Sequence, residues 1–238
     1  MNSAWSYVRG FERVSLCDWP GCNTSVIFMG GCNMRCPTCH NYTIAWQPEQ
    51  VPAISRQSIL TYLKNRAKWI DGVVVTGGEA TLVPQLETVL HDIKALGMRI
   101  KLDTNGMRPD VVESLMQQQL VDLFAVDVKG PWELYPRLTG GTHSPEEART
   151  GLSRIFALAQ TAPEAFLFRL TQVPVLTPDH IDTARQYLPQ GFTLKLQDYV
   201  APRRSHAETD SETRRMSGDV VTGPHSAGHT ESAQSQRH

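Results

Sequence analysis

Three cysteines, Cys32, Cys36 and Cys39, lie within eight residues of the chain, separated by three and two intervening residues. Clustered thiolates are soft ligands that select zinc, Cu(I) or iron-sulfur clusters. A structural zinc site needs four protein ligands, whereas a four-iron cluster held by only three thiolates keeps one iron free to bind a further ligand. The zinc alternative would need a fourth ligand from among His40, Cys17 and Cys22.

Further polar and glycine residues recur later in the chain, each group at or near the end of a short apolar run. These residues are Gly77, Gly78 and Glu79, then Asp103 and Thr104, then Asp127 and Lys129, and finally Arg169. Taken singly, each group has an ordinary explanation, because Gly-Gly is common in turns and a lone charge usually faces solvent. Because all four groups occupy similar positions relative to successive apolar runs, together they indicate a shared site.

The elements that must position these residues follow from the hydrophobic pattern. Short β-branched runs alternate with amphipathic stretches, which is typical of parallel strands joined by crossover helices. Six strands are expected, at residues 24–29, 72–76, 99–103, 123–128, 166–174 and 192–197. Apolar residues at helical spacing predict helices around residues 86–96 and 148–159. Ser144, Pro145 and Glu147 form a capping signal before the second of these helices, and Thr177-Pro178 opens the last helix.

This pattern predicts an α/β fold with a partial (β/α)6 TIM-like barrel of parallel strands. Six strands are too few to close an eight-stranded barrel. In barrels of this kind the chemistry lies at the carboxyl ends of the strands, where the groups named above fall.

Composition narrows the class of protein. The 238 residues carry 23 Lys and Arg against 24 Asp and Glu, so there is no long-range field that would favour nucleic acid, and no apolar run approaches a membrane span. Five cysteines, an odd number, suit metal or redox chemistry in a reducing compartment better than a disulfide framework, so we expect a cytoplasmic protein. Residues 201–238 contain no aromatic side chain and few apolar ones, which predicts a disordered polar tail. The expected division is an N-terminal segment (1–23), a core domain (24–200) and the tail (201–238).

The C-x3-C-x2-C spacing and the strand-end groups together resemble the radical S-adenosylmethionine (radical SAM) enzymes. Within that superfamily, the segment Gly10–Gly21, with Gly31-Cys32-Asn33 and Cys39-His40-Asn41, is similar to the activating enzymes of glycyl radical enzymes. The resemblance covers about residues 10–200. It is strongest to the activating proteins of anaerobic ribonucleoside-triphosphate reductase, and it extends to pyruvate formate-lyase activating enzymes.

The resemblance implies a cofactor set and a role for each residue. Cys32, Cys36 and Cys39 would hold one [4Fe-4S] cluster, whose open iron would bind S-adenosylmethionine. Cleavage would yield a 5′-deoxyadenosyl radical that abstracts hydrogen from a glycine of a partner enzyme, with flavodoxin or ferredoxin as electron donor, and no side chain need act as a general base. The residues expected to bind S-adenosylmethionine are Thr38, His40, Gly77, Gly78, Glu79, Asp103, Thr104, Asp127, Lys129 and Arg169.

Several of these residues have specific expected partners. Glu79 would pair with the ligand's ammonium group, and Lys129 and His40 would suit its carboxylate. Asp103, Thr104, Asp127 and the carbonyl group of residue 125 match positions that bind a monovalent cation in pyruvate formate-lyase activating enzymes.

One residue departs from the family's pattern, and two other functions stay open. Thr38 stands where an aromatic residue commonly lies against adenine, so we expect adenosine binding to be weaker by about 1 kcal/mol. The alternative within the superfamily is an enzyme acting on a small molecule such as a deazapurine precursor. The alternative outside it is a zinc or iron-sulfur binding protein without catalytic activity.

Overall fold

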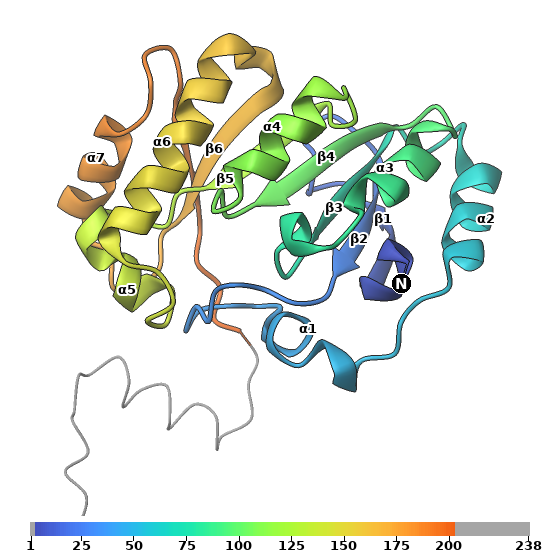
Figure 1. The fold of residues 1–238 in the computed structure, drawn as a ribbon, viewed down its shortest axis with the longest axis horizontal. Helices are drawn as coiled ribbons and strands as arrows, with labels where there is room; N and C mark the ends of the chain where they lie inside the picture. The colour runs from blue at the N-terminus through green and yellow to red at the C-terminus, as the bar shows by residue number, and fades with distance from the viewer. Residues whose placement is uncertain (1–2, 203–238) are drawn as a thin grey trace, which may run out of the picture. The chain divides into compact units, whose positions relative to one another are not determined.

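The computed structural model describes residues 3–202 and shows a sheet of seven strands that follow one another in sequence order (Figure 1). The strands are β1 (Val8–Ser15), β2 (Thr24–Met29), β3 (Gly72–Gly77), β4 (Arg99–Thr104), β5 (Leu123–Asp127), β6 (Phe166–Thr171) and β7 (Leu194–Gln197). Strands β2 to β7 are all parallel, and β1 pairs with β2 in the antiparallel direction. The six predicted parallel strands and the α/β fold are therefore confirmed.

The strand β1 was not predicted. It lies inside the expected N-terminal segment, and its pairing with β2 places that segment in the same sheet as the core. Two other expected strands are shorter than predicted, since β6 ends at Thr171 and β7 begins at Leu194. The expected tail lies, apart from residues 201 and 202, outside the described residues.

Helices connect the parallel strands. They are α1 (Tyr42–Trp46), α2 (Arg56–Arg66), α3 (Leu86–Lys94), α4 (Pro109–Gln117), α5 (Tyr135–Leu138), α6 (Pro145–Thr161) and α7 (Pro178–Gln186), and short 3-10 turns occur at Ala4–Tyr7, Pro48–Gln50, Ala80–Leu82, Trp132–Leu134 and Pro163–Ala165. The capping box predicted at Ser144 and Glu147 is present, and Thr177 caps α7 with His180. The predicted helical faces in α3 and α6 are buried.

The two faces of the sheet have different partners because side chains alternate along each strand. Val73 and Val75 of β3, and Ile100 and Leu102 of β4, join one core with the helices. Val74, between the two valines, belongs instead to a small apolar cluster with Trp19, Cys22 and Val26. We call the face that carries Val74 the inner face. The alternation therefore assigns Lys101 and Asp103 of β4 to this inner face as well.

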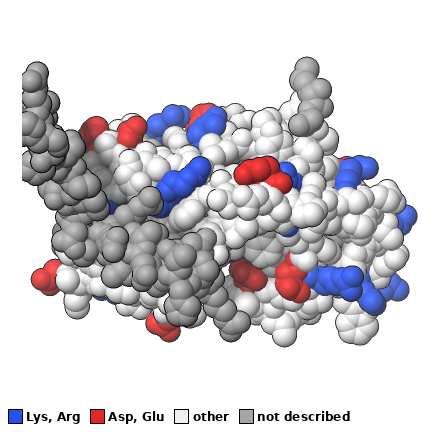
Figure 2. Space-filling view, turned by 90° about the horizontal axis from the view of Figure 1, so that it is seen from below, with Lys and Arg blue, Asp and Glu red and all other residues white. Residues whose placement is uncertain are grey.

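The surface matches the balanced composition. On the face drawn in Figure 2, basic and acidic side chains are interspersed among neutral ones wherever the described residues are visible. Among residues 3–202, no helix is both long and apolar enough to cross a membrane.

Candidate active site at the carboxyl ends of the strands

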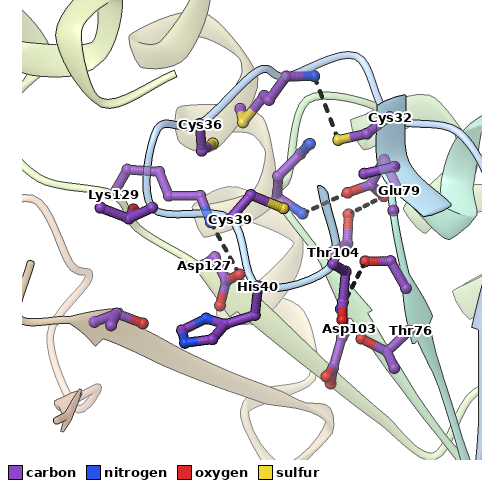
Figure 3. A pocket seen from close by; sticks show the side chains of 18 of the residues that line it. Cys32, Cys36, Cys39, His40, Thr76, Glu79, Asp103, Thr104, Asp127 and Lys129 are labelled. Atoms are coloured by element: carbon purple, nitrogen blue, oxygen red, sulfur yellow. Dashed lines mark hydrogen bonds and ion pairs between the residues drawn. The ribbon is translucent and has the colours of Figure 1, made fainter. Parts of the chain in front are cut away.

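A cavity of about 240 Å³ lies where the carboxyl ends of the parallel strands meet the cysteine-bearing loop (Figure 3). Every residue nominated from the sequence lines it. These residues are Cys32, Cys36, Thr38, Cys39, His40, Gly77, Gly78, Glu79, Asp103, Thr104, Asp127, Lys129 and Arg169. The structure thus brings the whole predicted set together, while their individual roles stay predictions. Cys17 and Cys22, which the zinc alternative would use, are not among the lining residues.

The cysteine-bearing loop is fixed to the rest of the fold at three points. The Gly31 amide donates to the Ile44 carbonyl (2.9 Å), and the Arg35 amide donates to the Thr139 carbonyl (3.0 Å). The Asn41 side chain donates to the carbonyl of Gly77 at the end of β3 (3.1 Å). The three thiols are consequently held above the strand ends by backbone contacts on both sides.

The thiols are largely shielded from solvent, and this affects their protonation. Burial raises the pKa of Cys32 to about 12, although the Met34 amide, which donates to its Sγ at 3.3 Å, acts in the opposite direction. Burial also raises the pKa of Cys36, against the effect of the nearby Lys129. Free thiols at these positions are therefore protonated at neutral pH, and they would release protons on binding a metal.

Gly77 and Gly78 allow the cysteine-bearing loop to approach β3. The Gly78 amide donates to the Met29 carbonyl and the Glu79 amide to the Gly31 carbonyl, both at 2.8 Å. A Cβ at Gly77 would overlap the backbone of Met29, and one at Gly78 would overlap the Gly31 carbonyl. The chain itself therefore makes a close backbone approach at both glycines.

Glu79 is buried beneath the loop with 1% of its surface exposed. Its Oε1 accepts hydrogen bonds from the Thr81 amide (3.2 Å), the Thr81 hydroxyl (2.5 Å) and the Thr104 hydroxyl (2.7 Å). Its Oε2 accepts from the Asn105 amide (2.8 Å). Burial raises the pKa of Glu79, and these hydrogen bonds offset part of that effect. Because Oε2 accepts from a single donor among the described residues, it retains capacity to accept from a ligand.

The other charged residues form a continuous chain of ion pairs along the inner face. Lys101 Nζ lies 2.6 Å from Asp103 Oδ1, and Arg169 bridges Asp103 Oδ2 (Nη2, 3.1 Å) and Asp127 Oδ1 (Nε, 2.5 Å). Lys129 Nζ then contacts Asp127 Oδ2 at 3.1 Å. Burial alone would raise the pKa of Asp127, but Arg169 and Lys129 outweigh it and hold that pKa below its usual range. We call these five residues the ion-pair chain.

Two predicted residues lie at the rim. The His40 ring nitrogen Nε2 contacts the carbonyl of Val200, so the segment after β7 lies against the mouth of the cavity. Thr38 also lines the cavity, and the expected loss of aromatic stacking there stays a prediction.

Three residues that shape the site were not nominated. Lys101 could have been found from the sequence, because it lies two positions before Asp103 and therefore on the same face of β4. Asn105 and Asn33 could not, since they meet only through the fold. Asn105 Nδ2 donates to Asn33 Oδ1 at 2.8 Å, and Asn33 follows directly after Cys32.

The donor set fits an iron-sulfur cluster. Three soft thiols line the cavity together with polar groups suited to a zwitterion. In the described part of the chain, no three Cys, His, Asp or Glu side chains converge closely enough to hold a single metal ion. A cluster of several metal atoms requires thiolates that stand further apart than the ligands of one ion.

Three thiols above the open end of a parallel α/β sheet define a class of enzyme, and the sequence comparison gives its family. Residues 26–188 match the Radical SAM superfamily, so the chain belongs to that superfamily of enzymes. Membership implies a four-iron cluster and S-adenosylmethionine as cofactors.

Among the relatives is a Methanocaldococcus jannaschii protein provisionally named as a glycyl-radical enzyme activating enzyme. It is 32% identical over 170 residues, which cover 70% of this chain and 68% of the relative. The pyruvate formate-lyase-activating enzyme of Clostridium pasteurianum is 30% identical over 127 residues, which cover 51% of this chain and 52% of that enzyme. The matched region thus spans just over two thirds of the first relative and about half of the second.

Solved structures support the fold alone. The structure of anSMEcpe with bound AdoMet superposes with a TM-score of 0.54 at 15% identity, covering 74% of this chain and 50% of that one.

Proposed function

We propose that this chain is an activating enzyme that uses one [4Fe-4S] cluster and S-adenosylmethionine to generate a glycyl radical on a partner enzyme. The observation that carries the proposal is the convergence on one cavity of the three cysteines, Glu79 and four members of the ion-pair chain, Asp103, Asp127, Lys129 and Arg169. The similarity to glycyl-radical enzyme activating enzymes supports it.

The role of the chain's own residues is to bind the cluster and S-adenosylmethionine and to orient them. Cys32, Cys36 and Cys39 would hold the cluster as thiolates, and binding would release the protons that burial favours on Cys32 and Cys36. When bound, the cluster supplies an electron and an open iron for the reductive cleavage of S-adenosylmethionine to methionine and a 5′-deoxyadenosyl radical. Glu79 Oε2 would accept from the ligand's ammonium, and Lys129, with donors beyond the one used by Asp127, would face its carboxylate. The surrounding walls would limit the access of water to a reactive species.

The protein substrate is proposed to reach the cavity from the side of the sheet. The strands do not close into a barrel, and three of the four residues of β7, at one end of the sheet, are exposed. An open side of this kind has room for a loop of a partner protein. The reaction would transfer a hydrogen atom from a glycine Cα to the deoxyadenosyl radical, leaving a glycyl radical and 5′-deoxyadenosine.

The partner and the electron donor are finer parts of the proposal. The segment Gly10–Gly21 resembles activating proteins of anaerobic ribonucleoside-triphosphate reductase, which makes that reductase the first partner to test. A single three-cysteine motif leaves the supply of electrons to an external flavodoxin or ferredoxin, and five cysteines suit a reducing cytoplasm. A monovalent cation is not part of the proposal, because the side chains expected to bind it are already engaged with the chain's own groups.

The experiment is anaerobic reconstitution with iron and sulfide, followed by reduction with S-adenosylmethionine and a candidate reductase. We expect 5′-deoxyadenosine together with a glycyl doublet in electron paramagnetic resonance. Matched controls are Cys36→Ala in this chain and replacement of the radical-bearing glycine of the partner by alanine, each of which should remove the doublet. Deoxyadenosine without a doublet from a competent partner would contradict the activase proposal, and no cleavage from an intact reduced cluster would contradict radical chemistry.

A second candidate has a specific observation in its favour. The 7-carboxy-7-deazaguanine synthase of Hyperthermus butylicus is 32% identical over 82 residues, but these cover only 34% of either chain. The same reconstituted protein should therefore be given the substrate of those synthases. Turnover of that substrate, without any glycyl radical, would favour the small-molecule function.

A further inference from the structure

The ion-pair chain contains a lysine where the sequence resemblance leads one to expect a bound alkali-metal ion. Lys101 lies on the inner face of β4, with only 2% of its side chain exposed, and its ammonium group is 2.6 Å from Asp103 Oδ1. A lysine is rarely buried so fully unless it is paired. Its position two residues before Asp103 on the same strand fixes the contact through local geometry alone.

The side chains that would coordinate a monovalent cation are all engaged. Asp103 contacts Lys101 and Arg169 with its two oxygens, and Asp127 contacts Arg169 and Lys129 with its own two. The Thr104 hydroxyl donates to Glu79 (2.7 Å) and accepts from the Gly106 amide (3.1 Å). Of the two carboxylates expected to bind the ion, Asp103 and Asp127, neither is left without a cationic partner, so these residues do not fit an alkali-metal site.

The net charge of the ion-pair chain also argues against a bound alkali-metal ion. Three cationic side chains surround two carboxylates, which leaves one unit of positive charge in the ion-pair chain. A bound sodium or potassium ion would add a second unit in a shielded site, where like charges repel strongly. The single surplus charge instead suits the one carboxylate of an incoming amino-acid ligand.

We infer that the Lys101 ammonium takes the place of a monovalent cation beside Asp103, so that this site binds its ligand without an alkali-metal ion. Lys101 acts through Asp103 and Arg169 and is therefore a positioning residue. It holds Asp103 on one side while Arg169 holds it on the other, which fixes the direction in which Arg169 and Lys129 face the cavity.

The first test measures the thermal midpoint of the full-length protein in potassium, sodium or tetramethylammonium chloride at equal ionic strength. An ion that binds the native state raises the midpoint, whereas tetramethylammonium is too large for such a site. We expect the wild-type midpoint to be the same in all three salts. For Lys101→Met, we expect a lower midpoint in tetramethylammonium that is partly restored by potassium or sodium. Lys68→Met, at an exposed lysine, is the matched control and should show no ion-specific shift.

The second test measures S-adenosylmethionine binding to the reconstituted protein by equilibrium dialysis in the same salts, and this arm rests on the proposed function. We expect the wild-type dissociation constant to change by less than about twofold between salts, and that of Lys101→Met to rise about tenfold in tetramethylammonium and to recover in potassium. Lys101→Arg, which keeps the positive charge, should bind S-adenosylmethionine with the same dissociation constant in all three salts.

Each outcome decides either the role of Lys101 or the proposed function. A wild-type midpoint that rises specifically with potassium or sodium would overturn the inference, and that result needs no variant to fold. If neither potassium nor sodium raises the thermal midpoint of a folded Lys101→Met variant, the claim that Lys101 takes the place of a monovalent cation is overturned. Absence of S-adenosylmethionine binding in every salt, with the thermal result as expected, would contradict the proposed function and leave the role of Lys101 standing.

Discussion

At the scale of single residues, Asp127 shows what the ion-pair chain contributes to stability. Asp127→Asn keeps the size of the side chain but leaves Arg169 and Lys129 without their shared carboxylate. Removing one member of a largely buried pair costs about 3–5 kcal/mol, so we expect the free energy of unfolding at neutral pH to fall by that amount. The control is Asp110→Asn, because Asp110 is 55% exposed and pairs only with Arg108 at the surface, where a loss below about 1 kcal/mol is expected.

The pH dependence of this effect has a definite sign. The pKa of Asp127 is depressed in the folded protein, so its stabilising effect is present above the unfolded carboxyl pKa of about 3.9 and is lost as pH falls below that value. The difference between wild type and Asp127→Asn in urea unfolding should therefore be full at pH values near neutrality and shrink under acid conditions. A difference that stays constant down to low pH would contradict the ion-pair assignment.

The sequence predicted which residues line the cavity better than it predicted the contacts that these residues make with one another. Residues such as Glu79 and Asp103 could be grouped because parallel strands end at one edge of the sheet. The partners of Glu79 could not, since the Asn105 amide and the Thr81 hydroxyl reach it only through the turns that follow β3 and β4. Lys101 was overlooked although its spacing from Asp103 was visible.

At the scale of elements, Gly77 sets the distance between the end of β3 and the end of β2, where the cysteine-bearing loop begins. Its φ is +119°, and an added Cβ would also overlap the backbone of Met29. Gly97, between α3 and β4, has a φ of +75° with open space around it. We expect Gly97→Ala to cost about 1–2 kcal/mol through backbone strain alone, and Gly77→Ala to cost distinctly more and to weaken S-adenosylmethionine binding. Equal unfolding free energies for the two variants, measured in urea, would show that the ends of β3 and β2 are not in close contact at Gly77.

The strands and helix starts that sequence reasoning identified carry local signals, and the one strand it missed does not. The start of α6 is encoded by Ser144, Pro145 and Glu147 themselves, so the capping box needs no distant partner. Strand β1 has no regular alternation, since only Val8 and Ser15 are buried, and its register with β2 is interrupted twice. Gly10 further weakens any strand signal. The strand conformation of β1 therefore depends on its hydrogen bonds with β2.

At the scale of the whole molecule, the cavity joins the ends of four strands, β3 to β6, to the cysteine-bearing loop, so binding there should stabilise the entire fold. A ligand at about 100 times its dissociation constant adds about 2.7 kcal/mol to the free energy of unfolding. For a chain of 238 residues, about 2–4 °C per kcal/mol is typical, so S-adenosylmethionine should raise the thermal midpoint of the reconstituted protein by roughly 5–10 °C.

This shift should depend on the cysteine-bearing loop and the strand ends acting together. Cys39→Ala removes one expected cluster ligand while leaving Glu79 and the ion-pair chain in place, so its midpoint should respond to S-adenosylmethionine by a small fraction of the wild-type shift. Cys17→Ala, at an exposed cysteine outside the cavity, should keep the full shift and serves as the matched control. An undiminished shift in Cys39→Ala would mean that the strand ends bind the ligand alone. The cysteine-bearing loop would then have to serve a purpose other than holding the iron to which the ligand binds.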